Sequence, residues 1–200
     1  GKIIVHTSGL LTSEIFKNYK VYKRDSASFH PAQTFPKISY KNNNYLKGIY
    51  FGIEGGEKAL RILKNITKKL GSNNIILSKK KKSMYHLGCV ISSNFMIANF
   101  YILKELSSTL GLSEKRFLEV LKPLFTRTAE NIHTEGVINS LTGPVIREDI
   151  RTIQSHLDLL HGKFPKFVEY YKTVSKILAD VSERQNKNFN KELILDIINK

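Results

Sequence analysis

The chain has 200 residues, of which 41% are hydrophobic, and its 32 Lys and Arg against 17 Asp and Glu give a formal net charge of +15. The hydrophobic content excludes a disordered basic tail, and a chain of this length buries a core as one domain or two small ones. No uninterrupted apolar run approaches the roughly 20 residues of a membrane-spanning helix. The apolar stretch at the start is too short for a signal peptide. We expect a folded cytoplasmic protein without a membrane partner.

The basic charge and the single cysteine each limit the function further. Only seven of the 32 basic residues are Arg, and the chain is rich in Ile and Asn, as in proteins from AT-biased genomes. We therefore favour a solvated surface over a polyanion site for the densest run, Lys79–Lys82, and expect no nucleic-acid partner; a basic nucleic-acid-binding module stays as an alternative. Cys89 cannot form an internal disulfide, and no Cys/His pair has zinc-ligand spacing, which favours a reducing compartment and no metal.

The first part of the chain alternates short apolar runs with turns, and it contains one clear helical period. Apolar residues spaced three and four apart predict an amphipathic helix over 57–70, closed by Gly71. Strands alternating with helices predict a largely parallel α/β sheet. The expected segments are strands at 3–6, 27–30, 48–54 and 74–77, a short helical stretch around 11–19, and a loop at Asn42–Asn44.

From Ser83 onward the apolar period is helical nearly throughout. The first of these helices is apolar on all sides, so it must be covered by the rest of this half or by a second copy of the chain. We predict two domains, 1–82 and 83–200, the second of them all-helical. The expected helices are 85–110, a helix capped by Ser113 that runs towards Ile132 with a bend at Pro123, a helix capped by Asp149 that runs to Leu160, and then 164–181 and 192–198.

Polar residues follow three of the predicted strands, where ligands bind in open α/β sheets. They are His6-Thr7-Ser8-Gly9, His30-Pro31 with Gln33-Thr34, and Glu54-Gly55-Gly56. Each has an ordinary structural explanation, since Thr-Ser-Gly and Gly-Gly are common in turns and Glu54 could cap the next helix. His30 is the candidate proton carrier among them.

Two further groups lie on predicted helices. Lys82, His86 and Ser93 fall on one stripe of the first long helix, with Asn94 off that stripe. Lys82 and His86 could polarise a carbonyl and move a proton, or they could end a solvated Lys run and pack at a domain seam.

The other group is Arg147, Asp149, Thr152 and His156. Thr152 and His156 share a helix face, and Arg147 precedes the helix cap, where a carboxylate or phosphate could dock. A capped helix with an exposed Arg explains the same residues.

The motifs resemble, in order and spacing, a known family over nearly the whole chain. That family comprises proposed oxidoreductases with a Rossmann-like N-terminal part and a C-terminal half called domain of unknown function 2520. It is related to prephenate dehydrogenases, pyrroline-carboxylate reductases and β-hydroxyacid dehydrogenases. The motifs are His6-Thr7-Ser8-Gly9, His30-Pro31-x-Gln33-Thr34-Phe35, Gly48-x-Tyr50-Phe51-x-Ile53-Glu54-Gly55, Lys82-x-x-Tyr85-His86, Ser93-Asn94, and Leu141-Thr142-Gly143-Pro144-x-x-Arg147-x-Asp149-x-x-Thr152-x-x-x-His156-Leu157.

The resemblance implies a partial Rossmann-like α/β domain followed by an all-α domain of the 6-phosphogluconate-dehydrogenase C-terminal type. It also implies NADP or NAD as cofactor in the full-length protein, a small-molecule substrate, and a homodimer formed through the helical domain. A non-catalytic dimeric binding or scaffold protein with the same architecture is the alternative. The implied catalytic residues are His30, His86 and Lys82, the cofactor-binding residues Thr7, Ser8 and Gly9, and the substrate-binding residues Gln33, Thr34, Asn94, Arg147, Asp149, Thr152 and His156.

The sequence departs from this family in one respect. Members begin with a strand and a G-x-G-x-x-G turn that binds the cofactor pyrophosphate, and these 200 residues contain no such turn. We expect the sequence to be a piece of a longer protein or the product of a truncated gene. Tight NAD(P) binding by these residues alone is therefore not expected.

Overall fold

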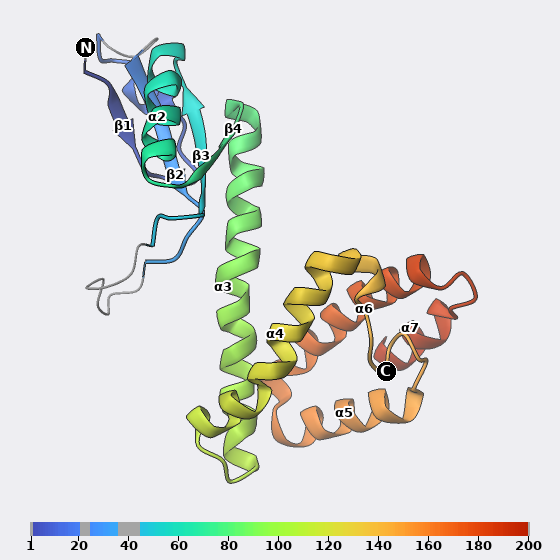
Figure 1. The fold of residues 1–200 in the computed structure, drawn as a ribbon. Coiled ribbons are helices and arrows are strands. Elements are labelled where there is room, and N and C mark those ends of the chain that lie inside the picture. Colours follow the sequence, from blue (N-terminus) through green and yellow to red (C-terminus); the bar gives the residue numbers. More distant parts are fainter. Residues whose placement is uncertain (1, 21–24, 36–44, 200) are drawn as a thin grey trace. The chain divides into compact units, whose positions relative to one another are not determined.

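The computed structural model describes residues 2–20, 25–35 and 45–199. The chain divides into two compact units, residues 1–100 and 101–200, and Figure 1 shows a sheet with helices in the first and helices alone in the second. The predicted loop at Asn42–Asn44 lies outside the described residues. The predicted domain boundary after residue 82 stays a prediction.

Over the residues that the structure describes, the sheet of the first unit has four strands, arranged in the order in which they occur in the chain. β1 pairs in parallel with β2, and β3 pairs in parallel with β4, whereas β2 and β3 are antiparallel. The predicted α/β class with a largely parallel sheet is therefore confirmed, with one antiparallel pair that the alternation of strands and helices did not predict. The strands are β1 (Ile4–His6), β2 (Ser26–Pro31), β3 (Tyr50–Gly55) and β4 (Asn73–Ile76).

The two central strands have one apolar face and one polar face, because successive side chains of a strand point to opposite sides. Phe29 and Phe51 stack with ring centroids 4.1 Å apart, and they pack with Ile53 against helix α2 (Glu57–Lys69). The opposite face carries the pairs Ser28↔Glu54 and His30↔Gly52, which are cross-strand neighbours in the register. Polar side chains from two strands are thereby brought to one surface.

Residues 11–19, which follow β1, are less helical than predicted. A short 3-10 helix, η1 (Ser13–Phe16), replaces the expected helical stretch around 11–19, and the hydroxyl of Thr12 accepts a hydrogen bond from the Glu14 backbone at its start. Glu54 does not cap the next helix, because Gly56 is the N-cap of α2. The Glu54 carboxylate instead binds Ser13.

Helix α3 (Lys79–Thr109) begins six residues before the predicted start, so the Lys run forms its first turn. By length and composition this helix could cross a membrane, which corrects the expectation drawn from uninterrupted apolar runs. The Lys and Glu residues are confined to its two ends, and the polar side chains between them are those of Ser, Asn, Tyr and His. A helix packed between protein surfaces has the same features, so this one helix does not by itself indicate a membrane protein.

The second unit consists of helices, as predicted. Ser113 and Asp149 are the N-caps of α4 and α5, which confirms both predicted caps. The helical backbone of α4 is interrupted at Gly136, with φ 78° and ψ 165°, rather than at Pro123. Two apolar clusters form the core, one around Ile153 and Ile194 and one around Phe167. The helices are α4 (Glu114–Asn139), α5 (Ile150–Lys163), η2 (Pro165–Phe167), α6 (Val168–Gln185) and α7 (Lys191–Asn199).

Candidate functional site

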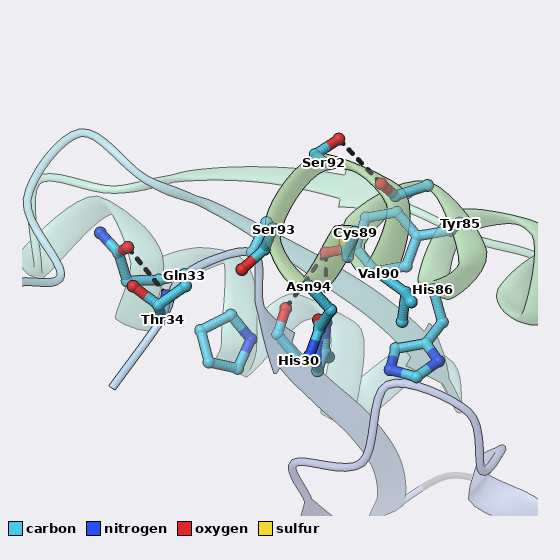
Figure 2. A pocket seen from close by; sticks show the side chains of 13 residues that line it. His30, Gln33, Thr34, Tyr85, His86, Cys89, Val90, Ser92, Ser93 and Asn94 are labelled. Atoms are coloured by element: carbon cyan, nitrogen blue, oxygen red, sulfur yellow. Dashed lines mark hydrogen bonds between the residues drawn. The ribbon is translucent and has the colours of Figure 1, made fainter. Parts of the chain in front are cut away.

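A cavity of about 720 Å³ lies in the first unit, between the chain that leaves β2 and one side of α3. Figure 2 shows His30 at the end of its strand, with His86 and Asn94 reaching down from the helix. Five of the predicted site residues line this cavity, namely His30, Gln33, Thr34, His86 and Asn94, together with Tyr85, Cys89, Ser92 and Ser93.

His30 is held by aromatic and hydrogen-bonding contacts with α3. Its Nδ1 lies 3.3 Å from the hydroxyl oxygen of Tyr85, and its ring meets those of Tyr85 and His86 edge-on, with centroids 5.6 and 5.7 Å away. Burial lowers the pKa of His30, and the charges of Lys82 and His86 lower it further. A neutral imidazole at the wall of a cavity is able to accept a proton from a bound molecule.

Gly9, which follows β1, allows both imidazoles to approach the backbone closely. A Cβ at this position would lie 2.9 Å from Nε2 of His30 and 2.1 Å from Cδ2 of His86. No side chain fits there without displacing the rings. The turn after β1 therefore sets where the two histidines sit, and Gly9 is buried beneath them.

Lys82 does not belong to the solvated part of its Lys run. Its side chain is fully buried, and its Nζ donates a hydrogen bond of 2.8 Å to the backbone carbonyl of Ser8. Lys79, by contrast, pairs with Glu14 at the surface. Burial lowers the pKa of Lys82, whereas the charge of Glu54 acts to raise it.

The predicted cofactor-binding turn, Thr7-Ser8-Gly9, is tied into the first unit by Ser8. The Ser8 amide donates to Nδ1 of His6, and the Ser8 hydroxyl accepts from the Leu11 amide. Thr7 is exposed at the end of β1. Of the three, Thr7 has the side chain that faces outward.

Three residues of the site were not among the predicted ones. Tyr85 packs against Gly52, where a Cβ would lie 2.7 Å from its ring, and burial together with neighbouring Cys89 raises the pKa of Tyr85 to about 12. Its phenol thus stays protonated. The available signals were the place of Tyr85 in the motif Lys82-x-x-Tyr85-His86 and the position of Cys89 beside the predicted stripe. For Glu54 on β3, the sequence signal was its position at the end of a predicted strand.

The predicted group in the second unit is largely a helix cap. The Asp149 carboxylate accepts from the Thr152 amide at 3.1 Å and from the Thr152 hydroxyl at 2.8 Å, and these hydrogen bonds lower the pKa of Asp149. Arg147 is exposed. His156, also exposed, places its Nδ1 3.0 Å from the hydroxyl oxygen of Tyr171. Among the described residues, no group of three or more His, Cys, Asp or Glu is arranged to hold a metal ion.

Comparison with known proteins agrees with this architecture. The family model described as "Domain of unknown function (DUF2520)" matches residues 49–177, which is more than half of the chain. The chain belongs to the DUF2520 family. No curated protein sequence matches it.

Two solved structures are similar to this DUF2520 chain over nearly its whole length. A protein from Thermotoga maritima is 35% identical, with a TM-score of 0.73, and the match covers 92% of this chain and 70% of that one. A proposed NADP oxidoreductase from Bacteroides fragilis is 27% identical, with a TM-score of 0.74 and coverage of 90% of this chain and 65% of that one. The fold is thus that of a Rossmann-like oxidoreductase family, and the chain spans about two thirds of these relatives.

Proposed function

We propose that this DUF2520 chain belongs to a cytoplasmic, dimeric NAD(P)-dependent oxidoreductase that interconverts a small carbonyl or imino compound with its alcohol or amine. The cavity of the first unit is its substrate site. His30 is the proton-transfer group. The Bacteroides fragilis relative supports the reaction class, since that protein is a proposed NADP oxidoreductase.

The observation that carries the proposal is the setting of His30. Its imidazole lines the cavity, contacts the Tyr85 hydroxyl and has a pKa lowered by burial. General bases work best when their pKa lies near the working pH, and a partly buried imidazole is the side chain closest to that condition. The cavity thus combines room for a small substrate with a group able to move one proton.

The reaction needs a proton and a hydride. The nicotinamide, when bound, would supply the hydride to the substrate carbon or accept it. In the direction of reduction, His30 in its protonated form donates its proton to the substrate oxygen or nitrogen as the double bond takes up the hydride. In oxidation His30 recovers that proton. His86 and the protonated Tyr85 phenol orient the same polar atom by hydrogen bonds, and Gln33, Thr34 and Asn94 bind the rest of the substrate.

The residues of this chain fit one end of the cofactor. The Thr7-Ser8-Gly9 turn follows β1 and borders the two imidazoles, so Thr7 and the backbone there would hold the nicotinamide end. The G-x-G-x-x-G turn that binds a pyrophosphate is not found in these 200 residues. We therefore assign no pyrophosphate contact to these residues.

The second unit, which includes the end of α3, is proposed to supply the dimer contact. Apolar side chains occur on every side of α3, which favours a position between protein surfaces. Arg147 and His156 are exposed and stay predicted substrate-binding residues, whereas Asp149 and Thr152 form the cap of α5.

Calorimetric titration of the full-length protein with NADPH and NADH tests the proposal, followed by a screen of keto and imino acids. We expect heat of binding with one or both cofactors and turnover with a member of the screen. Heat with neither cofactor would contradict it. Cofactor binding without turnover on a broad screen would favour a non-catalytic binding or scaffold protein instead.

A further inference from the structure

A loop of the first unit is held at both of its ends by buried charged side chains, and neither charge belongs to the cavity wall. The loop is residues 8–13, between β1 and η1. Glu54 and Lys82, which come from β3 and α3, are 3% and 0% exposed. Burying a charge is costly unless the charged group is well hydrogen-bonded. Two buried charges that contact the same loop therefore need an explanation.

Glu54 holds the far end of the loop. Its Oε2 accepts a hydrogen bond of 2.6 Å from the Ser13 amide, and its Oε1 accepts one of 2.8 Å from the Ser13 hydroxyl. Ser13 is itself only 3% exposed. Both carboxylate oxygens thus accept hydrogen bonds from one residue, which is the geometry of a carboxylate that binds a residue through two bonds.

Lys82 holds the near end. Its Nζ donates a hydrogen bond of 2.8 Å to the Ser8 carbonyl. The same carbonyl also accepts a hydrogen bond of 3.2 Å from the hydroxyl of Ser28. Ser28 lies directly across the sheet from Glu54. The two charges thus act on opposite ends of the same six residues, one from β3 and the other from the first turn of α3.

Gly9 lies next to the carbonyl that Lys82 holds. A Cβ on Gly9 would collide with the imidazoles of His30 and His86. A displacement of this backbone towards the rings would therefore push against His30 and His86.

We infer that Glu54 and Lys82 are positioning residues, which clamp the 8–13 loop at its two ends and thereby fix Gly9 beneath the imidazoles of His30 and His86. Lys82 acts on the site through Ser8 rather than on the substrate oxygen. Its positive charge also lowers the pKa of His30. This inference deepens the proposed function, but the clamp is a property of the protein without cofactor or substrate.

Amide hydrogen exchange and imidazole NMR titration of the full-length protein test the clamp without any ligand. We compare the wild type with Lys82→Met and Glu54→Gln, which remove one charge each while keeping much of the side-chain shape. Lys79→Met is the matched control, because that neighbouring Lys pairs with Glu14 at the surface.

We expect each variant to speed exchange of the Ser8, Leu11 and Ser13 amides about tenfold, the effect of losing one hydrogen bond to a charged group. A clamp predicts that both ends respond to either variant. Lys82→Met is also expected to raise the pKa of His30 and of His6, since the Lys82 charge lowers both, whereas Glu54→Gln is expected to lower the pKa of His6. Lys79→Met should change none of these.

The inference is overturned when Lys82→Met leaves amide exchange and the His30 pKa unchanged, or when each variant affects only its own end of the loop. Ser13→Ala keeps the test decisive should a charge variant not fold, because it removes only the hydroxyl that binds Oε1. It should speed exchange at Ser8 as well as at Ser13, and an effect confined to Ser13 contradicts the clamp. Failure of these outcomes leaves the oxidoreductase proposal standing, since that proposal is tested by cofactor heat and turnover.

Discussion

Two histidines of this chain make nearly the same contact and stand in different surroundings. Nδ1 of His30 lies 3.3 Å from the Tyr85 hydroxyl oxygen, and Nδ1 of His156 lies 3.0 Å from that of Tyr171. The rings cross at 87° and 88°. Yet His30 lines a cavity of about 720 Å³, its ring contacts that of His86, and the charge of the buried Lys82 acts on it. His156 is exposed beside a mostly apolar cavity of about 280 Å³.

The difference shows that a histidine–tyrosine contact does not by itself make a proton-transfer site. What sets His30 apart is burial and the charges around it, which together lower its pKa. The proposed proton step therefore belongs to the first unit, and variants of the two histidines should behave differently.

Exchanging each histidine for glutamine should give the largest contrast. His30→Gln in the full-length protein is expected to lower kcat by roughly 10²- to 10⁴-fold, the usual contribution of a general acid or base. His156→Gln should change KM more than kcat, because His156 is proposed to bind substrate and not to move the proton. Steady-state kinetics with a substrate from the screen measures both. Equal losses of kcat would place the proton step elsewhere.

Gly9→Ala should disturb the first site through its backbone. The added Cβ would lie 2.1 Å from Cδ2 of His86, and overpacking of this kind costs about 1–3 kcal/mol of unfolding free energy. Gly162→Ala in α5 is the matched control, since nothing lies within 4 Å of its Cβ position, and helical Gly→Ala is neutral or stabilising. Urea unfolding measures both. A Gly9→Ala protein as stable as the wild type, with unshifted imidazole signals, would refute the close contact.

Removing each tyrosine hydroxyl tests the contact that the two histidines share. Tyr85→Phe keeps the ring on Gly52 but removes the group that contacts His30, and we expect a roughly tenfold loss of kcat, as for one lost hydrogen bond. Tyr171→Phe should leave kcat unchanged. A loss of kcat with Tyr171→Phe and not with Tyr85→Phe would reverse the assignment of the two units.

The cap of α5 should make the second unit sensitive to acid. The folded pKa of Asp149 lies below its usual 3.8, mainly because of the Thr152 hydroxyl. The stabilisation is therefore complete above the unfolded pKa and is lost as the pH falls through the folded one. Thermal unfolding should show Asp149→Ala less stable than the wild type at pH 7, with the gap closing on acidification. A gap that widens towards acid pH would contradict the cap.

The sequence was most informative where a signal is local. The α2 period, the Ser113 and Asp149 caps and the strand before His30 follow from residues adjacent in the chain, and the structure confirms them. Family motifs also identified five residues that line one cavity.

Long-range contacts could not be predicted in this way. For Glu54 the local sequence allowed a helix cap, because its partner, Ser13, lies 41 residues away. Lys82 was predicted as a catalytic residue, with a solvated Lys run as the alternative, and neither predicts its burial or its hydrogen bond to Ser8, 74 residues away. The antiparallel pairing of β2 with β3 is likewise a contact between strands distant in the chain, which the alternation of strands and helices does not predict.

An NMR titration of the His30 imidazole in the full-length protein, assigned with the His30→Gln variant, tests the central claim most directly. The account predicts a midpoint below the ordinary value of 6.5, because burial and the Lys82 charge favour the neutral ring. It also predicts a rise of that midpoint in Lys82→Met. A midpoint at or above 6.5 that does not respond to Lys82 would contradict the assignment of His30 as the tuned proton-transfer group.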